Sequence, residues 1–586
     1  MTRIQVWAPL ARSVTLVAGA ATYGMEVVPG GWWRADVDAL GHGDDYSFLL
    51  DGEDTLLPDP RSAWQPHGVH GASRLYDHSR FSWTDAGWRG VQLPGSVVYE
   101  LHIGTFTTEG TLDAAVERLD HLVSLGVDLV ELMPVAAFPG VAGWGYDGVH
   151  PYAVHEPYGG PDALKRFVDA CHARNLGVCL DVVYNHLGPS GNYLPRFGPY
   201  FTDKHQTPWG AAVNLDDEGA LEVRRWIVEN ALMWLRDYHV DALRLDAVHA
   251  LEEDSPVHVL AELSRAVDAL SVAVRRPLAL IAESDLNQPR TVLPVDAGGM
   301  GMTAQWSDDF HHAVHTLLTG ESQGYYADFA AAPFEALGRT LTGAFFHDGR
   351  HSSFRGADWG ATVDRSAVPG WRFLGYLQTH DQVGNRAIGD RIGHVLSPGL
   401  ARIGAALVLT SPFTPMLFMG EEWGASTPWQ YFTSHEEDDL ALAVREGRRR
   451  EFASHGWAAE DVPDPQARST LAASTLDWSE SVSAETHSSM LAWYRSLIAL
   501  RRAEPWLSDP RLDRVSAAFD ASARWVVVTR GPLRVVCNLA ADAQAVPLDG
   551  PVAGVLASSE PRVAGGAGSS IDLPRESVAV VRMSAS

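Results

Sequence analysis

The chain has 586 residues, of which 46% are hydrophobic and 20% charged, and its formal net charge at pH 7 is −28. This length exceeds the roughly 250 to 300 residues that one hydrophobic core usually serves, so we expect several domains. The acidic balance argues against nucleic acid or an anionic membrane surface as a partner. It fits a soluble enzyme that acts on a neutral substrate.

The cysteine content and the N-terminus indicate the compartment. Only three cysteines occur, Cys171, Cys179 and Cys537, and none has the spacing of metal ligands. The start "MTRIQVWAPL" lacks the basic and apolar regions of a signal peptide. No uncharged apolar run reaches the roughly 20 residues of a membrane span. The sequence therefore predicts a cytoplasmic protein without a disulfide framework and without a membrane partner.

The first 90 residues consist of short runs with alternating polarity, separated by Gly, Asp and Pro: "RIQVWAP", "SVTLVAG", "WWRADVDAL" and "YSFLLDG". Alternation with a period of two is typical of strands that have one buried face. We therefore predict an N-terminal antiparallel β-sandwich over residues 1–90.

From Val97 the pattern changes to apolar strands that alternate with amphipathic helices. Residues 111–126 are predicted to form one helix, with Thr111 as its N-cap and Gly126 as its stop. Repeated βα units predict parallel strands with right-handed crossovers, and eight units favour a closed (β/α)8 TIM barrel over residues 91–509. The eight strand candidates are "VVYELHI", "VDLVELMPV", "VCLDVVYNH", "DALRLDAV", "LALIAES", "GMTAQWS", "RFLGYLQTHD" and "FTPMLFMGEEW".

Three further segments complete the organisation. The long irregular stretches 136–163 and 187–218 are expected to build a substrate cleft at the C-terminal face of the barrel. The tract "HEEDDLALAVREGRRREF" is predicted to be a solvated helix and loop without a function. The β-rich runs "RWVVVTRG", "LRVVCNLA" and "ESVAVVRM" predict a second β-sandwich over residues 510–586.

Acidic residues stand at the ends of several predicted barrel strands. In "DALRLDAVHA", Arg244 and Asp246 lie on one face of a strand, which we expect to point into the barrel mouth. Glu283 ends "LALIAES", and Asp381 follows "LGYLQT" after His380. Taken singly, each acid could be a helix N-cap, and Arg244 with Asp246 could be a structural ion pair. Three such acids on separate strands favour a common site.

Three acids in a cleft without metal ligands suit the retaining hydrolysis of glycosides. That reaction needs one carboxylate as nucleophile and a second as proton donor. Asp246 beside Arg244 fits the ionised nucleophile. Glu283, which we expect to have no adjacent cation and to have other acids converging on it, fits the protonated donor. Tryptophans in loops, as in "AGWGYDG" and "QTPWGAA", also suit a carbohydrate site, although most tryptophans serve packing.

Four segments resemble the short motifs of the α-amylase superfamily of glycoside hydrolases and transglycosylases: "DVVYNH", "ALRLDAVH", "IAES" and "LQTHDQ". They lie in the same order, on strands three, four, five and seven, and the resemblance covers nearly the whole chain. It implies Asp246 as nucleophile, Glu283 as general acid/base and Asp381 as transition-state stabiliser. It also implies that the sugar on the non-reducing side of the bond is bound by Tyr146, His186, Arg244 and His380.

The resemblance extends to further residues and to the substrate. Segments such as "YNHLGPSGNYL" and "QWSDDFHHAVHTLLTGE" are similar to one branch of the superfamily that acts on malto-oligosyltrehalose. This likeness implies cleavage of the α-1,4 bond next to the terminal trehalose unit, and malto-oligosyltrehalose and related α-glucans as partners. It implies a cleft lined also by His249, Asp308, Asp309, His311, His312, Gln382 and Asn385.

Several alternatives stay open at this stage. "SDDFHHAVH" could be an acid-rich N-terminus that opens a helix. A glycogen branching enzyme would use the same acids, and a non-catalytic polysaccharide-binding protein could keep the fold. Asn185 matches a position that binds calcium in some members, but no further ligand set accompanies it, so we predict no metal and no organic cofactor. The oligomeric state does not follow from the sequence.

Overall fold

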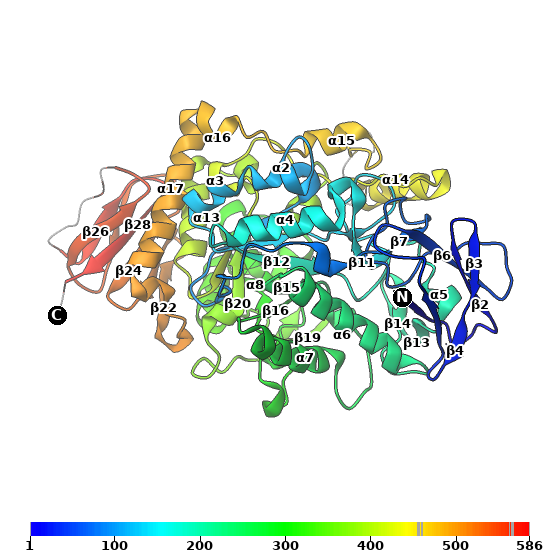
Figure 1. Cartoon of the computed structure of the whole chain (residues 1–586). Helices are drawn as coiled ribbons and strands as arrows, with labels where there is room; N and C mark the ends of the chain where they lie inside the picture. The colour runs from blue at the N-terminus through cyan, green and yellow to red at the C-terminus, as the bar shows by residue number, and fades with distance from the viewer. Residues whose placement is uncertain (1, 454–457, 459–460, 562, 564–567, 585–586) are drawn as a thin grey trace.

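The computed structural model describes residues 2–453, 458, 461–561, 563 and 568–584. Its centre is a closed barrel of eight parallel strands, in the ring order β12-β15-β16-β17-β20-β21-β8-β9 (Figure 1). Each of the eight predicted strands is present, and the predicted barrel is confirmed. The strands are β8 (Val98–Leu101), β9 (Leu129–Leu132), β12 (Gly177–Val182), β15 (Ala242–Leu245), β16 (Ala279–Ala282), β17 (Ala304–Trp306), β20 (Phe373–Tyr376) and β21 (Thr414–Phe418).

Helices surround the barrel because each presents one apolar face to the strands. In α13, for example, Ser397 accepts a hydrogen bond from the Leu400 N–H (3.2 Å), Pro398 opens the helix, and Ile403 and Leu407 are buried. The long helices of this layer, α13 included, are α4 (Gly160–His172), α6 (Ala220–Asp237), α7 (Val259–Val274), α8 (Asp308–Thr319), α10 (Pro333–Gly343), α13 (Pro398–Leu409) and α17 (Glu485–Ala503).

The helix predicted over residues 111–126 is two helices, α2 (Leu112–Val116) and α3 (Leu119–Leu125). Its limits are confirmed: the Thr111 side chain accepts a hydrogen bond from Ala114 N–H, and Gly126 ends the helix with φ 100°. The break comes at Arg118, whose φ of −102° and ψ of −4° both lie about 40° from typical α-helical values. The hydrophobic periodicity runs through the break, so the sequence does not reveal it.

Sheets lie at both ends of the molecule (Figure 1). The N-terminal region has two antiparallel sheets, β1-β5-β4 and β3-β2-β6-β7, and the C-terminal region has the sheets β22-β23-β24-β28-β26 and β25-β27. The sheet-rich ends are confirmed, whereas the limits 1–90, 91–509 and 510–586 stay a prediction. The strands are β1 (Thr2–Trp7), β2 (Val14–Ala18), β3 (Ala21–Gly24), β4 (Glu26–Val28), β5 (Trp32–Val37), β6 (Asp45–Leu50), β7 (Ser73–Arg74), β22 (Val515–Asp520), β23 (Trp525–Arg530), β24 (Leu533–Asn538), β25 (Gln544–Pro547), β26 (Val552–Ser558), β27 (Ser570–Leu573) and β28 (Ser577–Met583).

A buried arginine joins the C-terminal sheet to the barrel. Arg501 of α17 donates hydrogen bonds to the carbonyls of Ser411 (2.8 Å) and Phe413 (2.7 Å), just before strand β21, and to that of Leu507 (3.0 Å). Arg530 of β23 donates to the same Leu507 carbonyl (3.0 Å). The connection between barrel and sheet is therefore held from both sides.

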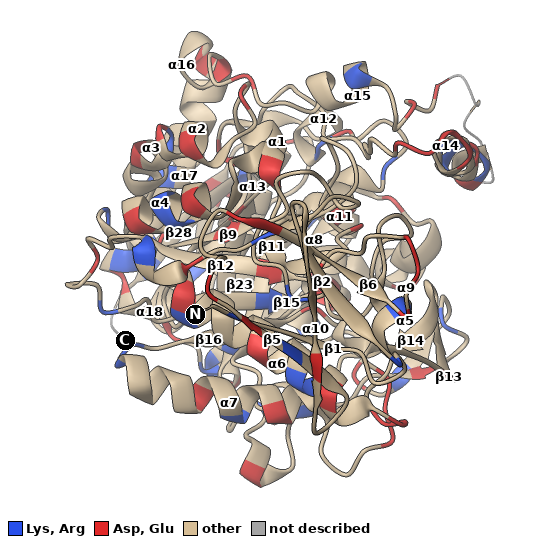
Figure 2. Ribbon diagram, turned by 45° about the vertical axis from the view of Figure 1, so that its right-hand side comes forward, with Lys and Arg blue, Asp and Glu red and all other residues tan. Residues whose placement is uncertain are grey.

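Charged residues are mixed over the surface. Figure 2 shows Asp and Glu scattered over the barrel helices, with Lys and Arg among them. The tract predicted to be a solvated helix is α14 (Asp438–Ala453), which carries both signs of charge. In the part of the chain that the structure describes, no helix is both long and apolar enough to cross a membrane.

Candidate active site

The three predicted acids meet at the C-terminal edge of the barrel. Asp246 follows β15, Glu283 follows β16, and Asp381 lies in the short helix α11 (His380–Gly384) after β20. All three line one cavity of about 1160 Å³. Since the C-terminal ends of parallel strands face the same edge, residues distant in sequence converge here.

Arg244 lies behind the acids and lines neither this cavity nor the smaller one beside it. Its guanidinium is fully buried, and Nη1 lies 2.8 Å from Asp181 Oδ2 and 2.8 Å from Asp246 Oδ1. Its Nη2 lies 3.6 Å from Glu283 Oε2, so the expectation that Glu283 has no cation beside it is wrong. The strand pairing is the cause: Arg244 lies opposite Ile281 of β16, and Ile281 precedes Glu283 by two residues. The guanidinium also lies over the Trp306 ring, 4.3 Å from its centroid.

Two further contacts fix the nucleophile candidate. Asn185 Nδ2 donates to Asp246 Oδ2 (2.8 Å) and to the Asp246 carbonyl (2.7 Å). Ala247 then adopts a left-handed conformation (φ 39°), and its N–H donates to Glu283 Oε2 (2.6 Å). Asn185 therefore serves the carboxylate, and this turn couples the backbone after β15 to the second acid.

The two acids differ in their electrostatic surroundings. Burial raises the pKa of Glu283 well above its usual range, and the charges of Asp246, Asp308 and Asp381 add to this effect. Arg244 opposes the shift. A pKa raised in this direction is what a general acid requires. Asp246, bonded by Arg244 and Asn185, has the partners of an ionised carboxylate.

Of the four residues predicted to bind the sugar, Tyr146, His186 and His380 line this cavity, and Arg244 does not. Tyr146 donates its hydroxyl to Asp181 Oδ2 (2.7 Å) and lies against His380, with ring centroids 5.2 Å apart. His186 stacks on Trp209, with centroids 4.6 Å apart at 12°. Trp209 is half exposed, so an indole face stands at the cleft, as the loop tryptophans had indicated. His249 also lines this cavity.

A second, smaller cavity of about 270 Å³ adjoins the first. Glu283 and Asp381 line both cavities, so the acids stand at the boundary between them. Asp308 lines the smaller cavity and accepts a hydrogen bond from the Tyr376 hydroxyl (2.5 Å). Burial raises the pKa of Asp308 to about 7. The other predicted residues that line this cavity are Asp309, His312, Gln382 and Asn385.

Two residues predicted from the family resemblance have different surroundings. Asp309 Oδ2 accepts hydrogen bonds from the N–H groups of Phe346 (2.7 Å) and His347 (2.8 Å), so it mainly anchors the chain after α10. His311 is buried against Tyr376, with centroids 5.8 Å apart, and lines neither cavity. Asp308 and Asp309 lie in the first turn of helix α8, as the alternative of an acid-rich helix N-terminus predicts. Asp308 nevertheless also lines the smaller cavity.

The sequence reading missed several cleft residues. Arg355 donates a hydrogen bond to Asp285 (2.5 Å), and its guanidinium carbon lies 4.3 Å from the centroid of the Trp359 ring. Arg355 and Trp359 both line the smaller cavity. They lie on the hairpin of β18 (Arg350–Ser352) and β19 (Ala357–Trp359), within the loop before β20. Its "FRGADW" composition was the available signal. Arg448 of α14 reaches the larger cavity, so that helix does have a place in the cleft.

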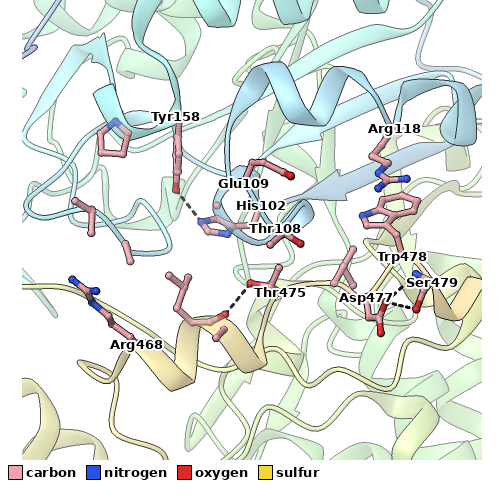
Figure 3. A pocket seen from close by; sticks show the side chains of 18 residues that line it. His102, Thr108, Glu109, Arg118, Tyr158, Arg468, Thr475, Asp477, Trp478 and Ser479 are labelled. Carbon is pink, nitrogen blue, oxygen red and sulfur yellow. Dashed lines mark hydrogen bonds between the residues drawn. The ribbon is translucent and has the colours of Figure 1, made fainter.

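Two features lie apart from the acids. Among the described residues, one trio could hold a metal ion, His205, Asp216 and Asp254, but the Lys204 ammonium already bridges the two carboxylates, 2.7 Å from Asp216 and 3.3 Å from Asp254. A separate pocket of about 730 Å³ is shown in Figure 3, where Arg118 covers the Trp478 ring and the Tyr158 hydroxyl meets His102. It shares no lining residue with the acid cleft.

The barrel and its acids define the class of the α-amylase-type glycoside hydrolases. The family described as "Alpha amylase, catalytic domain" matches residues 77–205, and a domain of unknown function, DUF3459, matches residues 510–580. The crystal structure of a putative α-amylase from Salmonella typhimurium is similar, with a TM-score of 0.90 and 39% identity over 99% of this chain and 97% of that one.

Full-length relatives narrow the class. Malto-oligosyltrehalose trehalohydrolase of Mycobacterium tuberculosis H37Rv is 52% identical over 585 residues, which is 99% of each chain. The enzyme of that name from Arthrobacter ramosus is 53% identical over 587 residues, again 99% of each. The chain belongs to the malto-oligosyltrehalose trehalohydrolase family.

Proposed function

We propose that the protein hydrolyses the α-1,4-glucosidic bond next to the terminal trehalose unit of malto-oligosyltrehalose, with retention of configuration. It then releases trehalose and a malto-oligosaccharide. The observation that carries this proposal is the position of Glu283 and Asp381 at the boundary of two unequal cavities. The bond is cut at this boundary, so each side of the substrate occupies one cavity.

The two cavities suit the two products. The larger one, with Trp209 and Tyr146, takes the malto-oligosaccharide chain, whose length varies. The smaller one takes the leaving group. In trehalose the two anomeric carbons are joined to each other, so no glucan chain continues from a reducing end. A compact cavity walled by Phe354, Arg355 and Trp359 fits a leaving group of this limited size.

The residues have distinct roles in the reaction. Asp246 attacks the anomeric carbon while Glu283 transfers its proton to the departing trehalose oxygen. The resulting glycosyl-enzyme ester is cleaved by water, from which Glu283 now takes a proton. Arg244, 2.8 Å from Asp246 Oδ1, holds this carboxylate in place before the attack and pairs with it again after the ester is cleaved. Asp381, at the edge of both cavities, stabilises the positive charge that develops on the sugar ring.

The nearest alternative is glucan branching, in which a sugar hydroxyl replaces water as the acceptor. One assay separates the two. Purified protein is incubated with maltopentaosyltrehalose and, separately, with amylose, and the products are resolved by chromatography and by the proton NMR signal of α-1,6 linkages. We expect free trehalose from the first and no new branches from the second. Branches without trehalose would refute the proposal, and Asp246→Asn is the inactive control.

The free cysteines support a cytoplasmic location for the reaction. Cys171, Cys179 and Cys537 are all buried and unpaired, which suits the reducing cytoplasm that the sequence predicted. No organic cofactor takes part in the proposed steps, since both proton transfers and the covalent bond involve carboxyl groups of the chain.

A further inference from the structure

Glu100 lies on β8, in the interior of the barrel beneath the cleft. It is 1% exposed and lines neither cavity of the active site. In the strand register it stands directly beside Glu131 of β9, so two carboxyl side chains occupy neighbouring positions in a buried layer. A buried carboxylate is costly unless hydrogen bonds and an opposite charge compensate it. Glu100 therefore needs a compensating partner in the barrel interior.

That partner is His380, a residue 280 positions later in the chain. The His380 backbone N–H donates to Glu100 Oε2 (3.0 Å), and its Nδ1 donates to Oε1 (2.5 Å). Both oxygens of one carboxylate thus bind one residue, at the backbone and at the ring. The imidazole can neither rotate nor shift with the first turn of α11 without breaking one of these bonds.

The opposite edge of the same ring faces the reaction. His380 Nε2 lies 2.8 Å from the Tyr146 hydroxyl and 3.5 Å from Asp381 Oδ1, and both of these residues line the larger cavity. A single imidazole therefore connects a buried anion on one side with the sugar site on the other. Because Nδ1 donates its proton to Glu100, the ring becomes positively charged by binding a second proton at Nε2.

We propose that Glu100 is a positioning residue for the hydrolysis: it holds His380 in one orientation and as an imidazolium, so that the Nε2 edge presents a positive charge to Asp381 and to the sugar site. Glu100 acts through His380 and does not touch the substrate. The inference rests on the proposed function, because it assigns a role within that reaction.

The charged groups around His380 decide the sign of the effect. Burial lowers its pKa, Asp381 and Glu100 raise it, Arg244 lowers it, and the balance is a pKa of about 9. Tyr146, Asp181, Glu131 and His102 are the other titratable groups that face the ring. Removing the charge of Glu100 lowers the His380 pKa, so the imidazolium is lost at a lower pH.

Glu131 provides a matched control. Burial raises its pKa to about 8, with Glu100 as the next cause, so it is protonated at neutral pH. Glu131→Gln exchanges a neutral carboxyl group for an amide of similar shape, in the same layer and the same register. A general disturbance of the barrel interior would appear in this variant as well.

The experiment measures kcat/KM for trehalose release from maltopentaosyltrehalose between pH 5 and 9. In Glu100→Gln we expect a loss of about 100-fold at pH 8, and of less than about 10-fold at pH 5.5, where His380 regains its proton. Glu131→Gln is expected to keep the wild-type profile. In a His380→Asn background, Glu100→Gln should cost little more, since the residue through which it acts is gone.

Three results would overturn the inference: an equal loss at both pH values, the same profile in Glu131→Gln, or full additivity with His380→Asn. If Glu100→Gln does not fold, Glu100→Asp carries the test, because its shorter carboxylate withdraws from Nδ1. An unchanged alkaline limb in that variant also refutes the inference. Wild-type enzyme that releases no trehalose would instead refute the proposed function, so the two failures are distinguishable.

Discussion

Replacing Arg244 by methionine would leave Asp181 and Asp246 without their shared cation. Arg244 is fully buried and lies 2.8 Å from both carboxylates. Breaking a buried ion pair from one side costs about 3–5 kcal/mol, because the remaining charge stays desolvated. A domain has a free energy of unfolding of about 5–15 kcal/mol, so the variant should fold but be strongly destabilised.

The pH dependence distinguishes this cause from lost packing. Even with Arg244 present, burial raises the pKa of Asp181 to about 6, from an ordinary value of 3.8. Without the cation this pKa rises further. A carboxyl whose folded pKa is raised destabilises the protein above that pKa, and the penalty disappears as pH falls and both states bind the proton. We therefore expect the loss in Arg244→Met to be about 3–5 kcal/mol at pH 7.5 and to be smaller by up to about 2 kcal/mol at pH 5, since the Asp181 pKa is already about 6 in the parent protein.

The assay is urea unfolding of the full chain at the two pH values, followed by tryptophan fluorescence. Arg501→Met is the matched control, because Arg501 is equally buried but donates to backbone carbonyls and to no carboxylate. Its loss of stability should be the same at both pH values. A pH-independent loss in Arg244→Met, or an equal pH dependence in the control, would refute the electrostatic explanation.

Three further changes probe the cleft. Glu283→Gln should lower kcat by roughly 10²–10⁴-fold while circular dichroism stays unchanged, since only a proton donor is removed; wild-type turnover would contradict its role. Asp308→Asn removes a charge that raises the Glu283 pKa, so the alkaline limb of kcat/KM should move to lower pH, and a limb that moves upward would contradict the assignment. Gly384→Ala would put a Cβ 2.1 Å from Trp144 Cζ2, so we expect a loss of about 1–3 kcal/mol and a higher KM, measured by thermal unfolding and kinetics. Gly393→Ala, which meets no atom within 4 Å, is its control, and equal effects in the two would be evidence against steric overlap.

The barrel could be predicted because its signals are local. Each strand is a short apolar run that ends in polar residues, and Asp246 and Glu283 directly follow such runs. Once eight strands close into a ring, chain order alone brings their C-terminal ends together. The convergence of the acids therefore follows from strand positions, without knowledge of any side-chain contact.

The environment of each acid could not be predicted in this way. Glu283 lies 3.6 Å from Arg244 because β15 and β16 pair in parallel, and the register of that pair is a tertiary property. Helix α8 shows the same limit. Asp308 and His312 lie four residues apart and share the face toward the cleft, whereas His311 shares its face with His315 and packs inward. Helical spacing could have separated these two histidines.

The contributions from inserted segments were beyond reach for another reason. Arg355 and Arg448 lie on a hairpin and a helix with no periodic relation to the barrel. Their side chains enter the cleft only because the insertions fold back over its rim. Composition could identify them as polar and aromatic surface, but a surface residue and a cleft residue have the same sequence signature.

The double hold on the Leu507 carbonyl, by Arg501 from α17 and by Arg530 from β23, has a consequence for anyone who redesigns this chain. A truncation before residue 510 would remove Arg530, one of the two guanidinium groups at this carbonyl, and the strands β22, β28 and β26 that pack against α10, α13 and α17. Shortening or exchanging the C-terminal sheet therefore requires a redesign of its contacts with the barrel.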